Sequence, residues 1–423
     1  MKIAIIGAGL TGLTTGYRLS QKGHQVKIFE KEKTAGGLAG GFKPTSPTGG
    51  ENKWDWSLEK FYHHLFTSDS AIKNLVTELG LNDKLFFEEP KTSIYYQNQI
   101  AQFDSPISLI KFPFLNPLEK IQTASATLFL KIFPSWQILE KYTASKFLPK
   151  LYGRKAYQTL WEPLLKAKFG LYINQVSMAW FWARIHKRST KLGYIEGGFQ
   201  VLIEELVRQI EKHGGKFFFN YYIKNLNDIY HLSEFDRIII TIPTETFLNM
   251  APDLPSDYRE KLQNKKMLGS LNLILRLKNK FFQENTYWLN INDSGFPFVA
   301  VVEHTNFIDK KYYGDERILY IGGYYPQDHR YFKMSKEQIF KEFLPYLKTI
   351  NPSFDFSLCS MPYVVCSSLY AQPIISTNYS QMNLPHETPD PKIILANMEQ
   401  VYPWDRGTNY AVALGDKISR YFI

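Results

Sequence analysis

The chain has 423 residues, 44% of them hydrophobic and 21% charged, which is typical of an ordinary globular protein with two or three joined domains. No run approaches eighteen apolar residues, and no apolar leader follows Lys2, so we expect neither a membrane-spanning helix nor a signal peptide. Two cysteines and nine histidines show neither a disulfide framework nor metal-ligand spacing, so we expect no metal site and a cytoplasmic protein.

The first thirty residues predict a strand, a glycine turn, a helix and a second strand. Residues 2–6 are a short run rich in isoleucine, and residues 10–21 have apolar side chains at helical spacing. Between them, Gly7, Gly9 and Gly12 form a G-x-G-x-x-G motif in the context in which it binds a dinucleotide. The first glycine permits the tight turn, the second lets a pyrophosphate approach the backbone, and the third allows close packing of helix on strand.

The predicted helix begins at Leu10 and Thr11, where unpaired N–H groups and a partial positive charge favour phosphate binding. The second strand, residues 25–29, ends at Glu30, and Lys31 follows in the same turn. A carboxylate at this position can accept both ribose hydroxyls of the adenosine half and would repel a 2′-phosphate. The sequence therefore favours a dinucleotide other than NADP.

A glycine doublet follows the acidic residue. In "KTAGGLAGG", Gly36, Gly37 and Leu38 resemble the extended fingerprint of FAD enzymes of the glutathione-reductase type. That resemblance implies that the doublet passes beside the cofactor's diphosphate and that the dinucleotide is FAD. From the residues alone, a flexible glycine loop remains an alternative.

Two adjacent histidines, His63 and His64, precede a helix that we predict over residues 70–79. Paired histidines are often ordinary hydrogen-bonded residues. In this position either could also serve as acid, base or hydrogen-bond partner to a cofactor.

Residues 91–192 are strand-like at first and then mainly helical, which indicates an inserted domain. Between residues 107 and 168 there are ten Lys or Arg and three Asp or Glu, interleaved with aromatic and aliphatic residues. One interpretation is a lobe that binds an anionic ligand or contacts a membrane peripherally at its inner face, and the other is a helical cap with a solvated lysine face. No nucleic-acid module is visible, so we expect no nucleic-acid partner.

The remaining chain returns to a glycine turn, a helix and a strand, then alternates like antiparallel strands, and ends in a strand and a helix. We therefore expect an α/β fold in which a Rossmann-type FAD-binding domain is interleaved with a mixed or antiparallel-sheet substrate domain and a helical insertion. The expected boundaries are 1–90, 193–250 and 386–423 for the FAD-binding domain, 91–192 for the helical insertion and 251–385 for the antiparallel sheet.

This order and these motifs resemble the flavin-containing amine oxidase superfamily, including protoporphyrinogen oxidase-like and phytoene desaturase-like enzymes, with partial similarity to UDP-galactopyranose mutase. The resemblance implies that the backbone of Ile223 faces the adenine. It also implies that residues 161–185 line the substrate side of the flavin, with Lys168 and Arg184 among them. By spacing alone the same segment could be a core helix that carries two surface cations.

The stretch "ILANMEQVYPWDRGTNYAVAL" resembles the family's C-terminal flavin motif. Asn397 lies where an acid is usual, and it can donate a hydrogen bond without adding negative charge. The N-terminus of the last helix would stabilise an anionic reduced flavin, and Arg406 could do the same or clamp an anionic substrate. The residues expected at the flavin are Asn397, Met398, Gly407, Thr408 and Asn409.

Three features bear on the activity that the resemblance implies. Leu38 lies where many amine oxidases carry arginine, and no lysine matches their lysine at flavin N5. His64-Leu65-Phe66 resembles the mutase motif whose histidine lies against the isoalloxazine ring. No cysteine or histidine lies near the motifs where relatives attach their flavin, so we expect non-covalent FAD.

The leading hypothesis is an FAD-dependent oxidoreductase that takes hydride from a bulky, anionic or lipid-linked small molecule to flavin N5. The alternative is a redox-neutral, flavin-dependent sugar-nucleotide mutase, which the histidine motif and the excess of cations favour. A non-catalytic carrier of the Rab escort type is disfavoured, because the glycine motif, Glu30 and the C-terminal flavin motif are intact.

Overall fold

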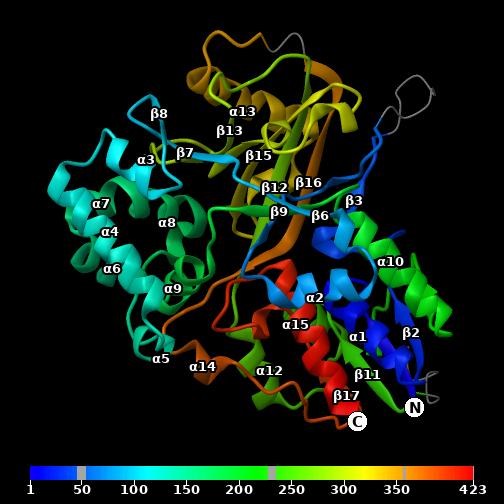
Figure 1. The fold of residues 1–423 in the computed structure, drawn as a ribbon. Helices are drawn as coiled ribbons and strands as arrows, with labels where there is room; N and C mark the ends of the chain where they lie inside the picture. The colour runs from blue at the N-terminus through cyan, green and yellow to red at the C-terminus, as the bar shows by residue number, and fades with distance from the viewer. Residues whose placement is uncertain (45–53, 227–234, 356–358, 423) are drawn as a thin grey trace.

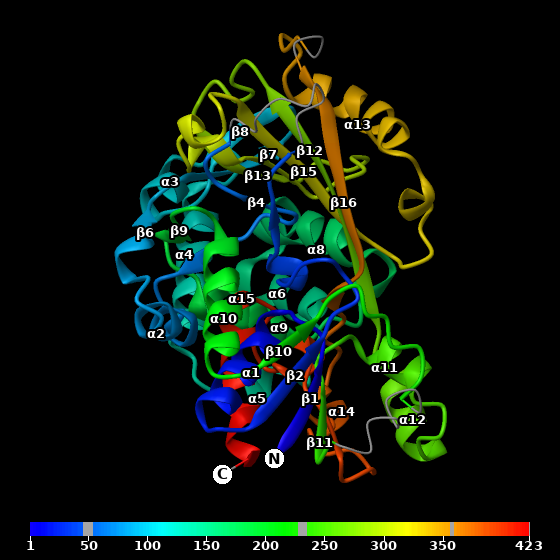
Figure 2. The ribbon, with the colours of Figure 1, turned by 90° about the vertical axis from the view of Figure 1, so that its right-hand side faces the viewer.

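Two β-sheets of different kinds organise the molecule (Figure 1). The computed structural model describes residues 1–44, 54–226, 235–355 and 359–422. Figure 2 shows the smaller parallel sheet with its helices at one end of the molecule and the larger sheet at the other. One hydrophobic cluster joins the two ends, since it contains both Ile5 of the parallel sheet and Tyr320 of the larger sheet.

The parallel sheet has five strands in the order β10-β2-β1-β11-β17, and every pair is parallel. Its central strand β1 buries four of its five residues, as expected for a strand covered on both faces. These pairings confirm the predicted Rossmann-type domain built from separate parts of the chain. The strands are β1 (Lys2–Ile6), β2 (Gln25–Phe29), β10 (Lys216–Phe218), β11 (Arg237–Ile240) and β17 (Ile393–Leu395).

Helices of the described chain cover both faces of this sheet. On one face lie α1 (Leu10–Gln21), α10 (Phe199–Lys212) and α15 (Thr408–Ser419), and on the other lie α11 (Thr244–Met250) and α12 (Ser256–Gln263). In Figure 1, α1 (blue) and α15 (red) lie side by side. The predicted helix after the paired histidines forms α2 (Ser70–Glu78), which packs on α15.

The larger sheet has seven strands in the order β16-β12-β15-β14-β13-β7-β8. All its pairs are antiparallel except β13 with β7, so the sheet is mixed, as expected. The helix α13 (Lys336–Ile350) packs its apolar side on this sheet. The strands are β7 (Lys91–Tyr96), β8 (Gln99–Gln102), β12 (Met267–Leu277), β13 (Thr286–Ile291), β14 (Ala300–Glu303), β15 (Arg317–Tyr325) and β16 (Cys359–Pro373).

The helical insertion forms a lobe with its own hydrophobic core at the left of Figure 1. Because β7 and β8 pair within the large sheet, the predicted segment 91–192 divides between that sheet and the helices. The helices are α3 (Pro106–Lys111), α4 (Pro117–Ile132), α5 (Trp136–Leu139), α6 (Ala144–Tyr152), α7 (Arg154–Ala156), α8 (Glu162–Phe169) and α9 (Met178–Lys187).

Short elements connect these parts. The strands β5 (Leu65–Phe66), β6 (Leu85–Glu88) and β9 (Leu192–Ile195) form a small sheet, and β3 (Gly41–Phe42) pairs with β4 (Leu58–Glu59). The helix α14 (Tyr379–Met382) completes the description. None of the helices in the described ranges is both long and apolar enough to cross a membrane.

Candidate flavin and substrate site

In the glycine turn between β1 and α1, the fold itself requires Gly7 and Gly12, whereas Gly9 is available for a ligand. Gly7 has a positive φ of 105°, and its N–H donates to the Phe29 carbonyl at 2.9 Å. A Cβ on Gly12 would lie 2.0 Å from the Gly7 carbonyl oxygen, so the fold itself excludes a side chain there. A Cβ on Gly9 would meet nothing within 4 Å. Gly9 therefore faces open space, which fits the close approach of a pyrophosphate.

Glu30 lies at the carboxyl end of β2, beside this turn, and is buried. Its Oε2 accepts a hydrogen bond from the Ala8 N–H at 2.8 Å, and its Oε1 accepts one from the Glu32 N–H at 3.0 Å. Each carboxylate oxygen has a further lone pair. Glu30 thus holds the glycine turn in place and still has the acceptor capacity that a ribose needs.

The glycine doublet lies against the turn. The Gly36 N–H donates to the Ala8 carbonyl at 2.8 Å, and Gly9 and Gly36 form an isolated parallel bridge. Gly37 has a φ of 56°, and a Cβ on it would lie 3.3 Å from the Gly9 Cα atom. The doublet and Leu38 are therefore ordered beside the glycine turn, as a diphosphate site requires.

The helices α1 and α15 run parallel, with their N-termini at the same end. The Thr11 hydroxyl donates to the Ala411 carbonyl at 3.1 Å near their start, and the Lys22 ammonium donates to the Ser419 carbonyl at 2.9 Å near their end. Both N-termini thus lie at the carboxyl edge of the parallel sheet, where ligands bind in such folds. Gly407 is exposed directly before α15, and Thr408 and Asn409 form its first turn.

Asn397 follows β17, and its side chain is engaged within the protein. Its amide donates to the Ile242 carbonyl at 3.2 Å and to the Thr244 hydroxyl at 2.9 Å, and its Oδ1 accepts from the Glu399 N–H at 3.1 Å. Both amide N–H groups are occupied, which differs from the expectation of a free donor towards the cofactor. Through these hydrogen bonds, Asn397 instead connects the loop that contains Met398 to the loop that follows β11.

Ile223 lies on the side of the site where the adenosine half is expected. It is buried in a cluster with Phe29, and the neighbouring Tyr221 N–H donates to the Glu30 carbonyl at 2.9 Å. The segment that carries Ile223 therefore runs along the end of β2, close to the residue expected to bind the ribose.

On the other side of α15, a cluster of charges brings together residues that are far apart in the sequence. Arg184 of α9 pairs with Asp405, with Nη1 and Oδ2 at 2.5 Å. Arg406 donates through Nε to the Gln372 amide oxygen at 2.8 Å and through Nη2 to the Tyr324 hydroxyl.

Lys168 of α8 completes this cluster. We call it the substrate-side cluster, because Lys168 and Arg184 were expected on the substrate side of the flavin. Its Nζ lies 5.0 Å from the centre of the Tyr324 ring and 4.9 Å from that of Trp180. The same tryptophan donates to Asp405 at 2.9 Å. Lys168 and Arg184 are thus neighbours in one group of three cations and one carboxylate.

Burial and charge together set the protonation of this cluster. Burial lowers the pKa of Lys168 well below its usual value, and Arg184 and Arg406 lower it further against the opposing effect of Asp405. Burial would raise the pKa of Asp405, but the three cations outweigh it and hold that pKa well below the usual range. The carboxyl is therefore ionised, and Lys168 holds the most weakly bound proton. The excess of positive charge favours an anionic ligand.

The paired histidines are neutral near pH 7. Burial lowers the pKa of His63 to about 4 and that of His64 to about 3. His63 Nδ1 contacts the Phe61 carbonyl, which can only accept, so Nδ1 carries the proton and Nε2 is an acceptor. His64 packs against Phe66 and Trp288, and its Nδ1 is buried without a hydrogen-bond partner in the described structure.

Sequence analysis missed several residues of this site. Asp405 and Tyr62 lie directly beside expected site residues, in "WDRG" and "FYHH", but neither pattern indicates a contact. Tyr62 lies near Tyr324 and Arg406, and burial together with the Tyr324 phenol raises its pKa well above the usual value. Tyr324 itself lies on β15 within an alternating strand pattern, which gave no signal of function.

Comparisons with curated proteins find partial relatives. The chain is 28% identical over 252 residues to a 4,4'-diapophytoene desaturase of Staphylococcus haemolyticus, covering 51% of this chain and 48% of that protein. It is 26% identical over 181 residues to the mitochondrial protoporphyrinogen oxidase of Nicotiana tabacum, covering 42% and 34%. The matches therefore span about half the length of these relatives or less.

Solved structures share the fold at low sequence identity. Reduced UDP-galactopyranose mutase has a TM-score of 0.74 at 12% identity, covering 99% of this chain and 96% of that one. An oxidoreductase from Methanosarcina mazei has a TM-score of 0.73 at 15% identity, covering 99% and 100%. A family model described as flavin containing amine oxidoreductase matches residues 10–400. The chain therefore belongs to the flavin-containing amine oxidoreductases.

Proposed function

We propose that this protein is an FAD-dependent oxidoreductase that takes a hydride from a carbon of a bulky, anionic or lipid-linked small molecule. Family membership implies the flavin, which accepts the hydride at N5 when it is bound. The observation that carries the proposal is the cluster of Lys168, Arg184 and Arg406 beside the start of α15, where an anionic substrate would be held.

The proposed cofactor is FAD, bound non-covalently, since no cysteine or histidine lies near the motifs where relatives attach their flavin. The adenosine half would lie at Glu30, Lys31 and the Ile223 backbone, and the diphosphate would lie between the glycine turn and the glycine doublet. The N-terminus of α15 would stabilise negative charge on the flavin through its unpaired N–H groups. The residues proposed to hold FAD are Gly7, Gly9, Leu10, Thr11, Gly12, Glu30, Lys31, Gly36, Gly37, Leu38, Ile223, Asn397, Met398, Gly407, Thr408 and Asn409, with Asn397 acting through the loop that it fixes.

The protein's own contribution would be to orient the substrate and exclude water. The cations would hold the anionic group, while the rings of Tyr62 and Trp288, which meet edge to face at 4.7 Å, would offer an apolar surface. His63 would accept a hydrogen bond through Nε2, and neither histidine would supply a proton at pH 7 because both are neutral. Peripheral membrane contact through residues 107–168 is a separate proposal that does not depend on the reaction.

A redox-neutral, flavin-dependent sugar-nucleotide mutase is the second candidate. The three clustered cations support it, because they could bind the diphosphate of a nucleotide sugar. The two candidate reactions differ in their effect on the flavin. The oxidoreductase substrate would leave it reduced, whereas the mutase reaction would leave its redox state unchanged.

The visible spectrum of the purified protein provides the first test. Flavin bands at about one equivalent are expected, and acid precipitation should release all of the colour, whereas flavin in the pellet would contradict non-covalent binding. A colourless protein that takes up no added FAD would refute both candidates.

The reaction is tested next by mixing the oxidised protein anaerobically with porphyrinogens, polyprenyl compounds and UDP-sugars. Bleaching of the flavin absorbance by an anionic or lipid-linked compound supports the oxidoreductase. Isomerisation of a UDP-sugar by the dithionite-reduced protein, without bleaching in the oxidised one, would support the mutase instead.

A further inference from the structure

The exposed apolar side chains of this protein gather on one lobe. Of the fifteen large hydrophobic side chains that are exposed in the described part of the chain, nine lie between residues 107 and 171. Their exposed fractions reach 78% at Leu118 and 90% at Leu171. The nine are Ile107, Ile110, Leu118, Ile121, Leu128, Ile132, Ile138, Tyr142 and Leu171. A concentration of this kind marks an interaction surface.

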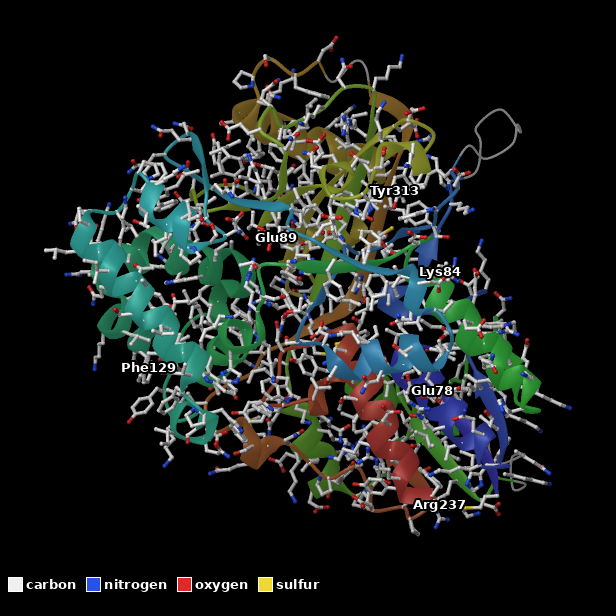
Figure 3. All side chains as sticks on the ribbon, in the orientation of Figure 1. Glu78, Lys84, Glu89, Phe129, Arg237 and Tyr313 are labelled. Atoms are coloured by element: carbon white, nitrogen blue, oxygen red, sulfur yellow. The ribbon has the colours of Figure 1, made fainter. Side chains whose placement is uncertain are left out.

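The helix α4 is apolar on two opposite sides. Its inward side buries Thr123, Ala126 and Leu130. At 100° per residue, the exposed Leu118, Ile121, Leu128 and Ile132 fall within a narrow stripe on roughly the opposite side. Figure 3 labels Phe129 of this helix at the outer edge of the lobe, away from the parallel sheet. Packing within the protein therefore leaves this second apolar side uncovered.

Positive charges dominate around the stripe. Lys111, Lys141 and Lys150 are exposed. The three acidic residues of the segment are engaged within the protein: Glu119 caps α4 with Asn116, Glu162 pairs with Lys166 at 2.8 Å, and Glu140 accepts from the Tyr402 hydroxyl at 2.8 Å. The outer surface of the lobe thus combines apolar side chains with unopposed lysines.

We propose that the face formed by α3, α4 and α5, here called the α4 face, docks on an anionic lipid bilayer. A helix that presents an apolar side flanked by lysines lies in the interface of a membrane, with its apolar side chains about 5–10 Å below the headgroups. A second copy of the chain fits this face less well, because it would bring two lysine-rich surfaces together. This docking does not depend on the proposed reaction.

The α4 face is joined to the substrate-side cluster by a single helix. The Trp182 indole of α9 donates to the Phe133 carbonyl at the end of α4 at 2.8 Å, and Lys131 donates to the Arg188 carbonyl just beyond α9. Arg184 of the cluster lies on the same helix α9. Lys131 therefore supports the joint between the helices, and it is a poor choice for testing surface charge.

Vesicle flotation of the full-length flavoprotein tests the docking. The probes are phosphatidylcholine vesicles with and without one-third phosphatidylglycerol, at low and high salt. We expect binding only to the anionic vesicles. Binding should fall steeply at high salt, because salt screens the attraction between lysines and anionic headgroups.

Two triple variants separate the contributions of charge and apolar surface. We expect Lys111→Gln, Lys141→Gln and Lys150→Gln together to lower the partition coefficient about tenfold or more. Leu118→Gln, Ile121→Gln and Leu128→Gln should lower it similarly and leave the flavin content unchanged, since these side chains are exposed. The matched control is Lys336→Gln, Lys341→Gln and Lys348→Gln on the distant α13, which removes the same charge and should bind as the parent does.

Three results would overturn the proposal. The first is no binding of the parent to anionic vesicles at low salt, and the second is an equal loss in the α13 control. The third is a parent that sediments as a dimer while the apolar variant sediments as a monomer, which would assign the face to a second copy.

Discussion

Glu59 lies inside the protein, next to the N-terminus of α10. Its Oε1 accepts from the Phe199 N–H at 2.8 Å, and its Oε2 accepts from the Tyr194 hydroxyl at 2.6 Å. Tyr313, labelled in Figure 3, belongs to the same buried group. Burial raises the pKa of the Tyr194 phenol well above its usual value, and Glu59 and Tyr313 raise it further. Burial raises the pKa of Glu59 to about 7, against the effect of its two hydrogen bonds. This carboxyl is therefore largely protonated in the folded protein below neutral pH.

Because the pKa of Glu59 is raised in the folded protein, its stability should fall as pH rises. Between about pH 4.5 and 7, the folded protein still holds a proton on Glu59 that the unfolded chain has lost. The stabilisation from this proton is fully present below about pH 4.5 and is lost as pH rises through about 7. Between pH 5 and 8 the free energy of unfolding should fall by about 2 kcal/mol through this group. Urea denaturation of the parent and of Glu59→Gln at both pH values measures it. An identical pH dependence in the variant would contradict the assignment.

Lys168 provides a second test at the residue scale. Because its pKa is lowered, its charge should be lost as pH rises through a value below the usual one, and anion affinity should fall with it. Titration of the holoprotein with inorganic pyrophosphate, followed by the flavin absorbance, measures this affinity. Lys168→Met should weaken binding about tenfold, the value of one charged hydrogen bond, and should flatten the pH dependence.

Lys166 is the matched control for this substitution. It lies on the same helix, is exposed and pairs with Glu162. Lys166→Met should leave both the affinity and its pH dependence as in the parent. Equal losses in the two variants would show that Lys168 acts only through general charge.

At the scale of elements, two substitutions in the β1–α1 turn distinguish an effect on cofactor binding from an effect on folding. Gly9→Ala places a methyl group in open space at a φ of −74°, so the protein should fold normally but retain much less FAD. Gly12→Ala places it 2.0 Å from the Gly7 carbonyl oxygen, so stability itself should fall. Thermal unfolding and flavin content distinguish the two. Full flavin in Gly9→Ala would show that no phosphate approaches this glycine.

The elements that the sequence predicted best are those with local patterns. The first β-α-β unit and α2 follow from glycine positions and helical periodicity, which short stretches contain. The pairing of β7 with β13 could not be predicted. The two strands lie far apart along the chain, and no pattern in residues 91–96 indicates which strand they pair with. Lys168, Arg184 and Arg406 were each expected near the substrate. Their contacts with Tyr324 could not be predicted for the same reason, since these residues come from distant segments.

For the whole molecule, the hydrophobic cluster that joins the two sheets predicts that they unfold in a single transition. Cofactor binding should raise its midpoint, because the proposed FAD residues come from both ends of the chain and from its middle. A protein stripped of flavin should gain about 2.7 kcal/mol at an FAD concentration one hundred times the dissociation constant. Calorimetry of the stripped and reloaded protein measures this shift. Two separate transitions, only one of them sensitive to FAD, would contradict a shared core.

The parallel sheet also sets an order of events during synthesis. Its central strand β1 begins at Lys2, whereas its edge strand β17 ends at Leu395 and α15 follows later still. At about 5–20 residues per second, the ribosome completes β17 tens of seconds after β1 has emerged. In the first part of that interval β1 can pair with β2 but lacks β11, and until its end β11 lacks β17 and α1 lacks α15. The nascent glycine turn must therefore wait for nearly the whole chain before its cofactor site can close.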